Sequence, residues 1–276
     1  MAENRLKFFG WGRDGEEMTP DEEGFALRAY AALFGSADFP AVPTPGLDAV
    51  ALRQPRIAPP TALSALCSTE RYDRAAHSFG KSYRDTVLGM TNDYGTAPDV
   101  VAYPRDEADV AAVMDWAATV GAALLPFGGG SSVVGGVTVE AAREQPLVAL
   151  DLRELNKVVE VDRASRAARI QGGVFGPALE AQLKPHGLTL RHFPQSFEYS
   201  TLGGWIATRS GGHFASLYTH IDDLVQSIRV VTPAGAVETR RLPGSGAGPS
   251  PDRMFIGSEG VLGVITEAWM RLQDRP

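Results

Sequence analysis

Short apolar runs separated by turn-forming residues begin near residue 97, and they predict a series of strands. These runs cover residues 99–103, 122–125, 147–152, 158–161 and 167–171. Between the first two, an amphipathic stretch that begins at Arg105 or Asp106 places Val110 and Val113 on one face, which is typical of a helix. The pattern therefore predicts a βαβ unit, in which ligands bind at the carboxyl ends of the strands.

The second half of the chain repeats this mixture of helix and strand. Residues 177–184 carry a proline in the first turn of a predicted helix. Residues 224–233 and a return strand at Val237 predict a hairpin, and a closing strand is expected to end at Leu272. We place a first subdomain at residues 97–186 and a second at 187–272, both within a domain of residues 71–276.

Residues 1–70 are rich in proline, with one predicted helix around residues 22–33, so most of this N-terminal arm should be extended. The arm contains the pattern G-x-G-x-x-G at residues 10–15. A dinucleotide fingerprint needs a strand before it and a helix after it. Residues 7–9 are too short for that strand and Pro20 follows soon after, so the pattern does not predict a dinucleotide-binding fold.

The composition narrows the class of protein. A chain of 276 residues with 44% hydrophobic residues can form a substantial core, and a net charge of -7 without a basic run argues against a nucleic-acid partner. A single cysteine, Cys67, excludes an internal disulfide and is expected to be a buried thiol. We expect no metal site, and the absence of a membrane span or targeting signal predicts a cytosolic protein.

The most informative stretch is residues 126–136, which contains three consecutive glycines followed by two serines. Glycines without Cβ atoms let backbone N–H groups approach an anion closely, as in a diphosphate-binding loop. A flexible turn is the other interpretation of such a loop. Residues 194–212 form a second dense mixture of hydroxyls, glycines and apolar residues, in which Gly203 and Gly204 permit another close approach.

Four segments together resemble the FAD-contacting stretches of flavoproteins of the p-cresol methylhydroxylase and vanillyl-alcohol oxidase type, most closely those of its alkyldihydroxyacetonephosphate synthase branch. The first segment comprises Pro126, Phe127, Gly128, Gly129, Gly130, Ser131 and Ser132. The second comprises Gln195, Ser196, Phe197, Glu198, Tyr199, Ser200 and Thr201. The third comprises Thr208, Arg209, Ser210 and Gly211. The fourth comprises Glu259, Gly260, Val261, Leu262, Gly263, Val264 and Ile265.

This resemblance implies an α+β fold of two subdomains with FAD held between them, and it assigns the first segment to the FAD diphosphate. Relatives with covalent flavin carry histidine where this chain has Gly130, so the resemblance implies dissociable FAD. His213 lies in a different segment, and we expect a structural or surface role for it. The family usually has aspartate at the position of Gln195, which changes the charge expected there.

The resemblance also implies a substrate-binding cap domain after the strand that ends near Leu272. Because the catalytic residues of relatives come from that cap, no catalytic residue is assigned. We expect a truncated or split FAD-dependent oxidoreductase whose uncovered cofactor edge and final strand expose apolar surface, so that it self-associates, binds a partner chain or holds FAD weakly. The substrate is an unidentified small molecule. The alternatives are a non-catalytic flavin-binding module and a site for another nucleotide diphosphate, such as a sugar nucleotide.

Overall fold

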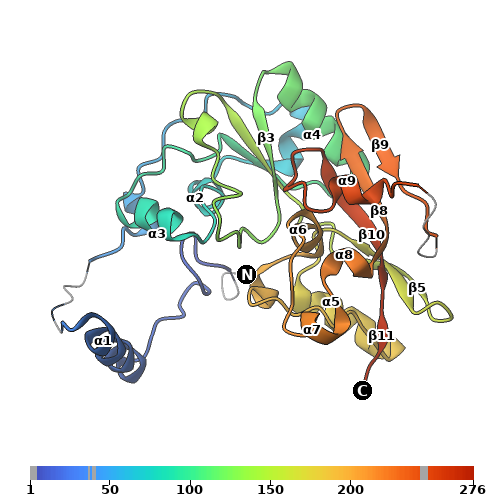
Figure 1. Cartoon of the computed structure of the whole chain (residues 1–276). Helices are drawn as coiled ribbons and strands as arrows, with labels where there is room; N and C mark the ends of the chain where they lie inside the picture. Colours follow the sequence, from blue (N-terminus) through green and yellow to red (C-terminus); the bar gives the residue numbers. More distant parts are fainter. Residues whose placement is uncertain (1–4, 37, 39–41, 243–247) are drawn as a thin grey trace.

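The structure is a computed structural model that describes residues 5–36, 38, 42–242 and 248–276. Two β-sheets with their helices form two adjoining parts of the main body (Figure 1). The first sheet has the strand order β1-β2-β4-β3 and the second the order β5-β6-β10-β8-β9. This mixture of parallel and antiparallel pairing with helices is the expected α+β class.

The first sheet contains the predicted βαβ unit. Strands β2 (Val100–Ala102) and β3 (Ala123–Phe127) each pair in parallel with β4 (Leu147–Asp151), and β1 (Cys67–Ser68) adds an antiparallel edge. Helix α4 (Glu107–Thr119) begins where the Asp106 side chain accepts a hydrogen bond from the Asp109 N–H. Val110 and Val113 are buried against the sheet, as predicted. Because β3 and β4 are parallel, their carboxyl ends meet at one edge.

The second sheet is antiparallel and is built from two hairpins around one central strand. One hairpin joins β5 (Val158–Asp162) to β6 (Ala167–Gln171), and the other joins β8 (Val225–Thr232) to β9 (Gly235–Glu238). Strand β10 (Val264–Arg271) lies between them and pairs with both β6 and β8. Since β10 is paired on both sides and mostly buried, the expectation that the final strand exposes apolar surface is wrong.

The change from one sheet to the other falls between β4 and β5, whereas the sequence pattern predicts a subdomain boundary near residue 187. Strands β5 and β6 pair with β10, so they belong structurally to the second half of the chain. Two short hairpins give no local signal of their sheet, because periodicity reports burial and not the identity of the partner strand. The outer limits of 1–70 and 71–276 remain predictions.

Helices cover the second sheet and complete its core. The predicted helix at 177–184 is α5 (Gly176–Leu183), whose Leu179 and Leu183 are fully buried.

The remaining helices of the body, from both halves of the chain, are α2 (Arg71–Ala76), α3 (Tyr83–Met90), α6 (Leu202–Ala207), α7 (Ala215–Tyr218), α8 (Ile221–Leu224) and α9 (Asp252–Phe255). Short 3-10 turns occupy Leu47–Ala49, Thr61–Leu66, Glu140–Arg143, Lys184–His186 and Phe197–Tyr199, and β7 (Leu188–Thr189) pairs with β11 (Gln273–Asp274).

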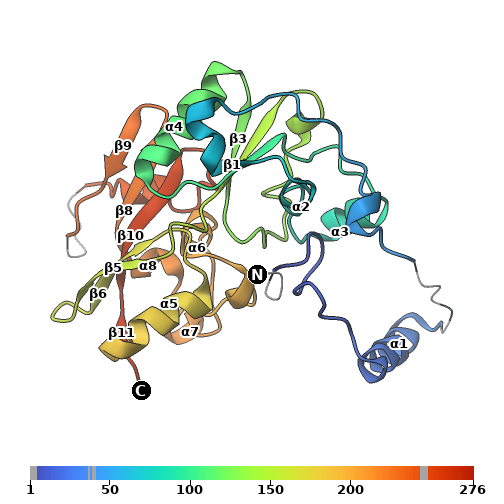
Figure 2. The ribbon, with the colours of Figure 1, turned by 180° about the vertical axis from the view of Figure 1, so that it is seen from behind.

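The N-terminal arm runs over the first half and then leaves it. Helix α1 (Pro20–Phe34), capped by Thr19, has no buried residue and stands apart from the body in both views (Figures 1 and 2). Before it, residues 5–16 form a tight turn closed by a bridge between Leu6 and Arg13. The G-x-G-x-x-G pattern therefore lies in a turn and not between a strand and a helix. The Arg53 and Arg56 side chains fix the returning chain to buried Asp99.

Candidate functional site

All four segments singled out in the sequence meet at one cavity of about 360 Å³. This glycine-loop cavity lies where the loop after β3 faces the second half of the chain. Of the predicted residues, those that line it are Pro126, Phe127, Gly128, Gly129, Gly130, Ser131, Ser132, Ser196, Ser200, Thr201, Thr208, Ser210, Glu259, Gly260, Gly263 and Ile265. Segments up to about 130 residues apart in sequence thus form a single site, which is what the combined motif predicts.

The glycine loop is tightly packed. A Cβ atom on Gly129 would lie 1.8 Å from the carbonyl oxygen of Tyr199, and one on Gly128 would lie 2.3 Å from Thr201 Oγ1. Gly130 has a φ of +64°, a conformation that favours glycine. Because any side chain at Gly129 would collide with backbone, the loop is held against residues 199–201. The interpretation of this stretch as a flexible turn is therefore wrong.

Hydroxyl groups and one tryptophan hold the walls of the cavity in place. Ser132 Oγ accepts a hydrogen bond from the Gly136 N–H at 2.9 Å. The buried Trp205 donates from Nε1 to Ser200 Oγ at 2.7 Å, and that hydroxyl donates to the Ser196 carbonyl oxygen at 2.7 Å. These bonds fix the orientation of groups that line the cavity, which favours a rigid binding site.

The buried side chain of His192 contacts Ser210, a residue of the third segment. It is 2% exposed, and its Nε2 lies 2.8 Å from the Ser210 hydroxyl. Burial, and to a smaller extent repulsion from nearby His220, lowers the pKa of His192 to about 4. The imidazole is therefore neutral near pH 7 and holds the Ser210 hydroxyl by a hydrogen bond without adding charge to the site.

The glycine-loop cavity has almost no formal charge. Within the described residues, Glu259 is the one charged side chain that lines it. An anion bound here would be held by backbone N–H groups and hydroxyls instead of lysine or arginine. Glu259 itself has a φ of +54°, which is uncommon for a residue with a side chain.

A wider cavity of about 710 Å³, which we call the outer cavity, adjoins the first and shares Ser131, Val133 and Ser196 with it. It contains three more predicted residues, Gln195, Tyr199 and Gly211, together with Gly212, His213, Pro194 and Trp11 of the arm. Trp11 contacts Tyr199 edge-on, with ring centroids 5.5 Å apart. His213 is exposed, as expected, but it also lines this cavity.

Six predicted residues line neither of these cavities. Phe197 packs on Trp205, Arg209 forms an ion pair with Asp222 at 2.7 Å, and Val264 is buried in the core. Glu198 lines a different cavity, described below. Val261 and Leu262 are 83% and 45% exposed. Since a residue can contact a ligand through its backbone, the assignment of these six residues to FAD remains a prediction.

Other lining residues were not assigned from the sequence, among them Leu152 and Ala207. Leu152 directly follows β4, and a rule that places ligands at the carboxyl ends of parallel strands could have found it. Ala207 ends α6 and has no comparable signal. Cys67 is half-buried and not fully buried, and burial raises its thiol pKa to about 11.

The described part of the chain shows neither a metal-binding cluster nor a membrane-spanning helix. No group of three or more histidine, cysteine, aspartate or glutamate side chains there could hold a metal ion. No helix among the same residues is long and apolar enough to cross a membrane.

The family follows from these features and from comparison with known proteins. Residues 98–240 match the model of an FAD-binding domain, and the chain belongs to this FAD-binding family. The match covers the βαβ unit, the glycine loop and the second and third segments. FAD is therefore the cofactor of this domain, as the resemblance implied.

Several known proteins are similar to this chain. The chain is 42% identical over 207 residues to alkyldihydroxyacetonephosphate synthase of Dictyostelium discoideum, covering 75% of this chain and 34% of that protein. It is 36% identical over 149 residues to an uncharacterized FAD-linked oxidoreductase of Escherichia coli, covering 54% and 30%. A solved structure of alkyldihydroxyacetonephosphate synthase superimposes with a TM-score of 0.85 at 34% identity, covering 98% of this chain and 55% of that one. The chain thus spans about a third of the length of these curated relatives.

Proposed function

We propose that this chain binds FAD non-covalently in the glycine-loop cavity and the adjoining outer cavity, as the FAD-binding portion of an FAD-dependent oxidoreductase resembling alkyldihydroxyacetonephosphate synthase. The observation that carries the proposal is the convergence of four separate segments on one cavity. Together the two cavities have room for a dinucleotide, since they measure about 360 and 710 Å³.

In this proposal the backbone N–H groups of residues 128–132 hold the diphosphate, because the glycines bring the backbone close and leave no Cβ between it and the ligand. The hydroxyls of Thr208 and Ser210 supply further hydrogen bonds from the opposite wall. Gly130 offers no imidazole for a covalent link to flavin, so the cofactor remains dissociable.

When bound, FAD supplies the electron-accepting chemistry, and the protein supplies position and electrostatics. The tight packing of the loop on residues 199–201 fixes the binding groups before the cofactor arrives. The neutral His192 keeps the Ser210 hydroxyl in place. The open outer cavity gives a small-molecule substrate access to the site. No catalytic residue is assigned within this chain.

A visible absorption spectrum of the purified chain, before and after acid precipitation, tests the proposal. We expect flavin bands in the protein as purified or after addition of FAD, and we expect the colour to pass into the acid supernatant. Colour that stays in the pellet would show a covalent flavin. A chain that is folded by circular dichroism but takes up no FAD would overturn the cofactor proposal.

The rim of the site favours a second candidate, a flavin-binding module that works with a partner chain. Apolar side chains gather beside the cavity, where Val133, Val134 and Val261 are 61%, 79% and 83% exposed. Exposed apolar patches of this kind mark interaction surfaces. If the rim binds a second copy, the wild-type chain should elute as an oligomer in size-exclusion chromatography and Val134→Asp as a monomer. A wild-type chain that elutes as a monomer would count against self-association.

A further inference from the structure

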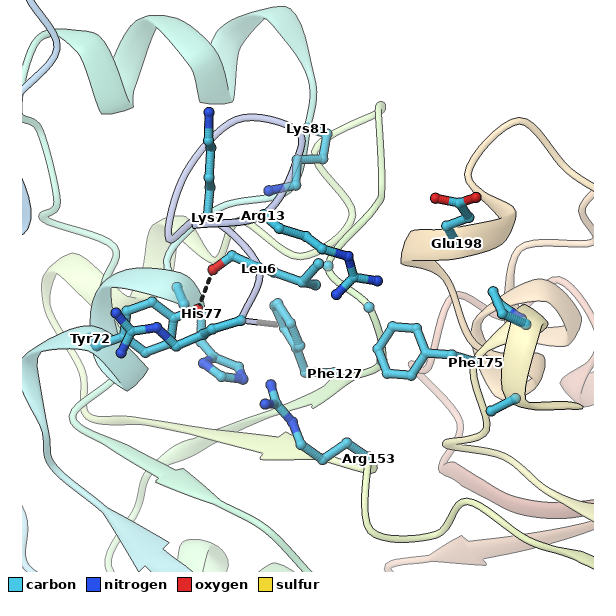
Figure 3. A pocket seen from close by; sticks show the side chains of 17 residues that line it. Leu6, Lys7, Arg13, Tyr72, His77, Lys81, Phe127, Arg153, Phe175 and Glu198 are labelled. Atoms are coloured by element: carbon cyan, nitrogen blue, oxygen red, sulfur yellow. Dashed lines mark hydrogen bonds between the residues drawn. The ribbon is translucent and has the colours of Figure 1, made fainter. Parts of the chain in front are cut away.

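A separate cavity of about 330 Å³ lies on the other side of the glycine loop and is shown in Figure 3. We call it the cationic cavity. It shares only Phe127 and residues 128–130 with the glycine-loop cavity. Its other walls come from the arm, from α2, from the segment around Lys81, from Arg153 after β4, and from the start of α5. Outside the shared wall, the lining residues include Arg5, Arg13, Tyr72, Lys81, Arg153 and Phe175.

The charge of this cavity is opposite to that of its neighbour. Five cationic side chains line it, those of Arg5, Lys7, Arg13, Lys81 and Arg153, against the single carboxylate of Glu198. Some of this charge is compensated outside the cavity, because Arg5 pairs with Asp14 at 2.7 Å and Lys7 lies 3.8 Å from Glu17. The lining nevertheless favours an anion.

Arg153 is fixed for binding by its own partner. Its Nε and Nη2 atoms donate to Asp151 Oδ2 at 2.9 and 2.6 Å, and His77 Nε2 lies 2.8 Å from the same oxygen. Asp151 is fully buried, so this pairing fixes the guanidinium. Within the described residues, Nη1 of Arg153 makes no hydrogen bond, so this edge remains to hold an oxyanion.

Lys81 faces the same space without a carboxylate partner within ion-pair distance in the described chain. Its ammonium group donates to the Gly10 carbonyl oxygen. Burial lowers its pKa to about 8, and the negative charge of Asp85 offsets only part of that effect. A partly desolvated ammonium of this kind gains stabilisation when an anion binds beside it.

Aromatic rings form the rest of the wall. Figure 3 shows Arg13 reaching in from the arm and Arg153 from the opposite side, with Phe127 and Phe175 between them. Tyr72 closes one end, where its hydroxyl donates to the Leu6 carbonyl oxygen and Arg5 stacks on its ring at 3.6 Å. An inorganic ion would leave these rings without contact, so the occupant has an apolar body as well as a charge.

We propose that the cationic cavity is a second ligand site, which binds a small organic anion with a carboxylate or phosphate group and an apolar, flat body. The cationic side chains that line the cavity, Lys81 and Arg153 among them, hold the oxyanion, and the apolar body lies against Phe127 and Phe175. This site is additional to the proposed FAD site and does not depend on it.

Isothermal titration calorimetry on the 276-residue chain, with and without added FAD, tests the site, with phenyl phosphate as the probe. Inorganic phosphate and benzyl alcohol serve as the charge-only and ring-only probes. We expect phenyl phosphate to bind at least about tenfold more tightly than either, while the flavin spectrum shows FAD retained. Equal binding of inorganic phosphate or of benzyl alcohol would overturn the proposed ligand class, and competitive release of FAD would assign the cavity to the cofactor.

Two variants locate the site. Ala178→Leu fills the cavity from an exposed position on α5, and Ala181→Leu is its matched control on the same helix outside the cavity. Lys81→Met removes the charge, and Lys157→Met, at an exposed position, is its control. We expect each cavity variant to weaken phenyl phosphate binding about tenfold or more, with FAD affinity and both controls unchanged. Unweakened binding in Ala178→Leu, which disturbs no buried group, would refute the site even if Lys81→Met failed to fold.

Discussion

The two cavities on either side of residues 128–130 differ in the groups that they offer to a bound anion. The glycine-loop cavity is lined by glycines, hydroxyls and one carboxylate, whereas the cationic cavity is lined by five cations and several rings. In the proposed site, the FAD diphosphate lies in the cavity without cations, where backbone N–H groups supply the positive dipoles. If FAD binds as proposed, formal charge alone points to the wrong cavity.

Gly129→Ala should have the largest effect, because it disrupts the wall that both cavities share. Its Cβ would lie 1.8 Å from the Tyr199 carbonyl oxygen, so the loop must shift. We expect FAD affinity to fall by at least about 100-fold, measured by fluorescence titration. Gly46→Ala is the control, because a Cβ there meets nothing within 4 Å. FAD affinity within twofold of wild type in Gly129→Ala would show that the glycine loop is not the cofactor wall.

Asp151→Asn should separate the two cavities. The change leaves Arg153 and His77 without their buried carboxylate, and we expect the free energy of unfolding to fall by about 3 kcal/mol. Phenyl phosphate binding should weaken more than FAD binding, because Asp151 supports the cationic side. Urea unfolding and parallel titrations measure both effects.

Asp274→Asn is the control for this change, since that carboxylate is 67% exposed in its pair with Arg166. It should leave both affinities unchanged. If Asp151→Asn weakened FAD and phenyl phosphate equally, the two cavities would have to be treated as one site.

The pH dependence of stability should report on buried His192, which contacts Ser210 of the glycine-loop cavity and does not line the cationic cavity. His192 has a pKa of about 4 in the folded chain against 6.5 for an ordinary histidine. The unfolded chain therefore binds more protons between these values, and the native state loses stability as the pH falls from about 6.5 toward 4. At pH 4.5 the loss from this group is about 2.5 kcal/mol relative to neutral pH.

His192→Gln should remove this part of the pH dependence in chemical unfolding, and His213→Gln, at an exposed position, should retain it. In wild type, FAD affinity should change only near pH 4, where the folded-state His192 beside Ser210 takes up its proton. An identical pH profile in wild type and His192→Gln would show that the buried imidazole does not titrate in this way.

Ser132→Ala should have the smallest effect. It removes the acceptor of the Gly136 N–H bond at 2.9 Å, at a half-buried position on the loop. We expect about 1 kcal/mol in FAD binding, or roughly fivefold in affinity, with phenyl phosphate binding unchanged. Ser165→Ala, on the turn between β5 and β6, is a control that should alter neither affinity.

The same two cavities show how far the sequence can be interpreted. The glycine-loop cavity is built from contiguous segments, so its loop and its four motifs could be recognised and their convergence predicted. The strands of the βαβ unit and α5 were predicted from periodicity for the same reason, because local burial patterns encode them.

The cationic cavity could not be predicted. Lys81 and Arg153 are single residues without a motif, and Arg5 and Arg13 come from a turn whose position depends on tertiary contacts. The sheet to which β5 and β6 belong was also out of reach, since their partner β10 follows β6 by more than 90 residues. Both failures have one cause, because pairing between distant segments leaves no signal in either segment alone.

The central place of β10 also bears on how the chain folds during its synthesis. The hairpins β5–β6 and β8–β9 can each form locally as they leave the ribosome, but neither can join the other until residues 264–271 follow. Until then each hairpin exposes an unpaired edge strand to which another nascent chain could pair. Such long-range pairing closes slowly, so the nascent second sheet is the part of this protein that most needs the protection of a chaperone.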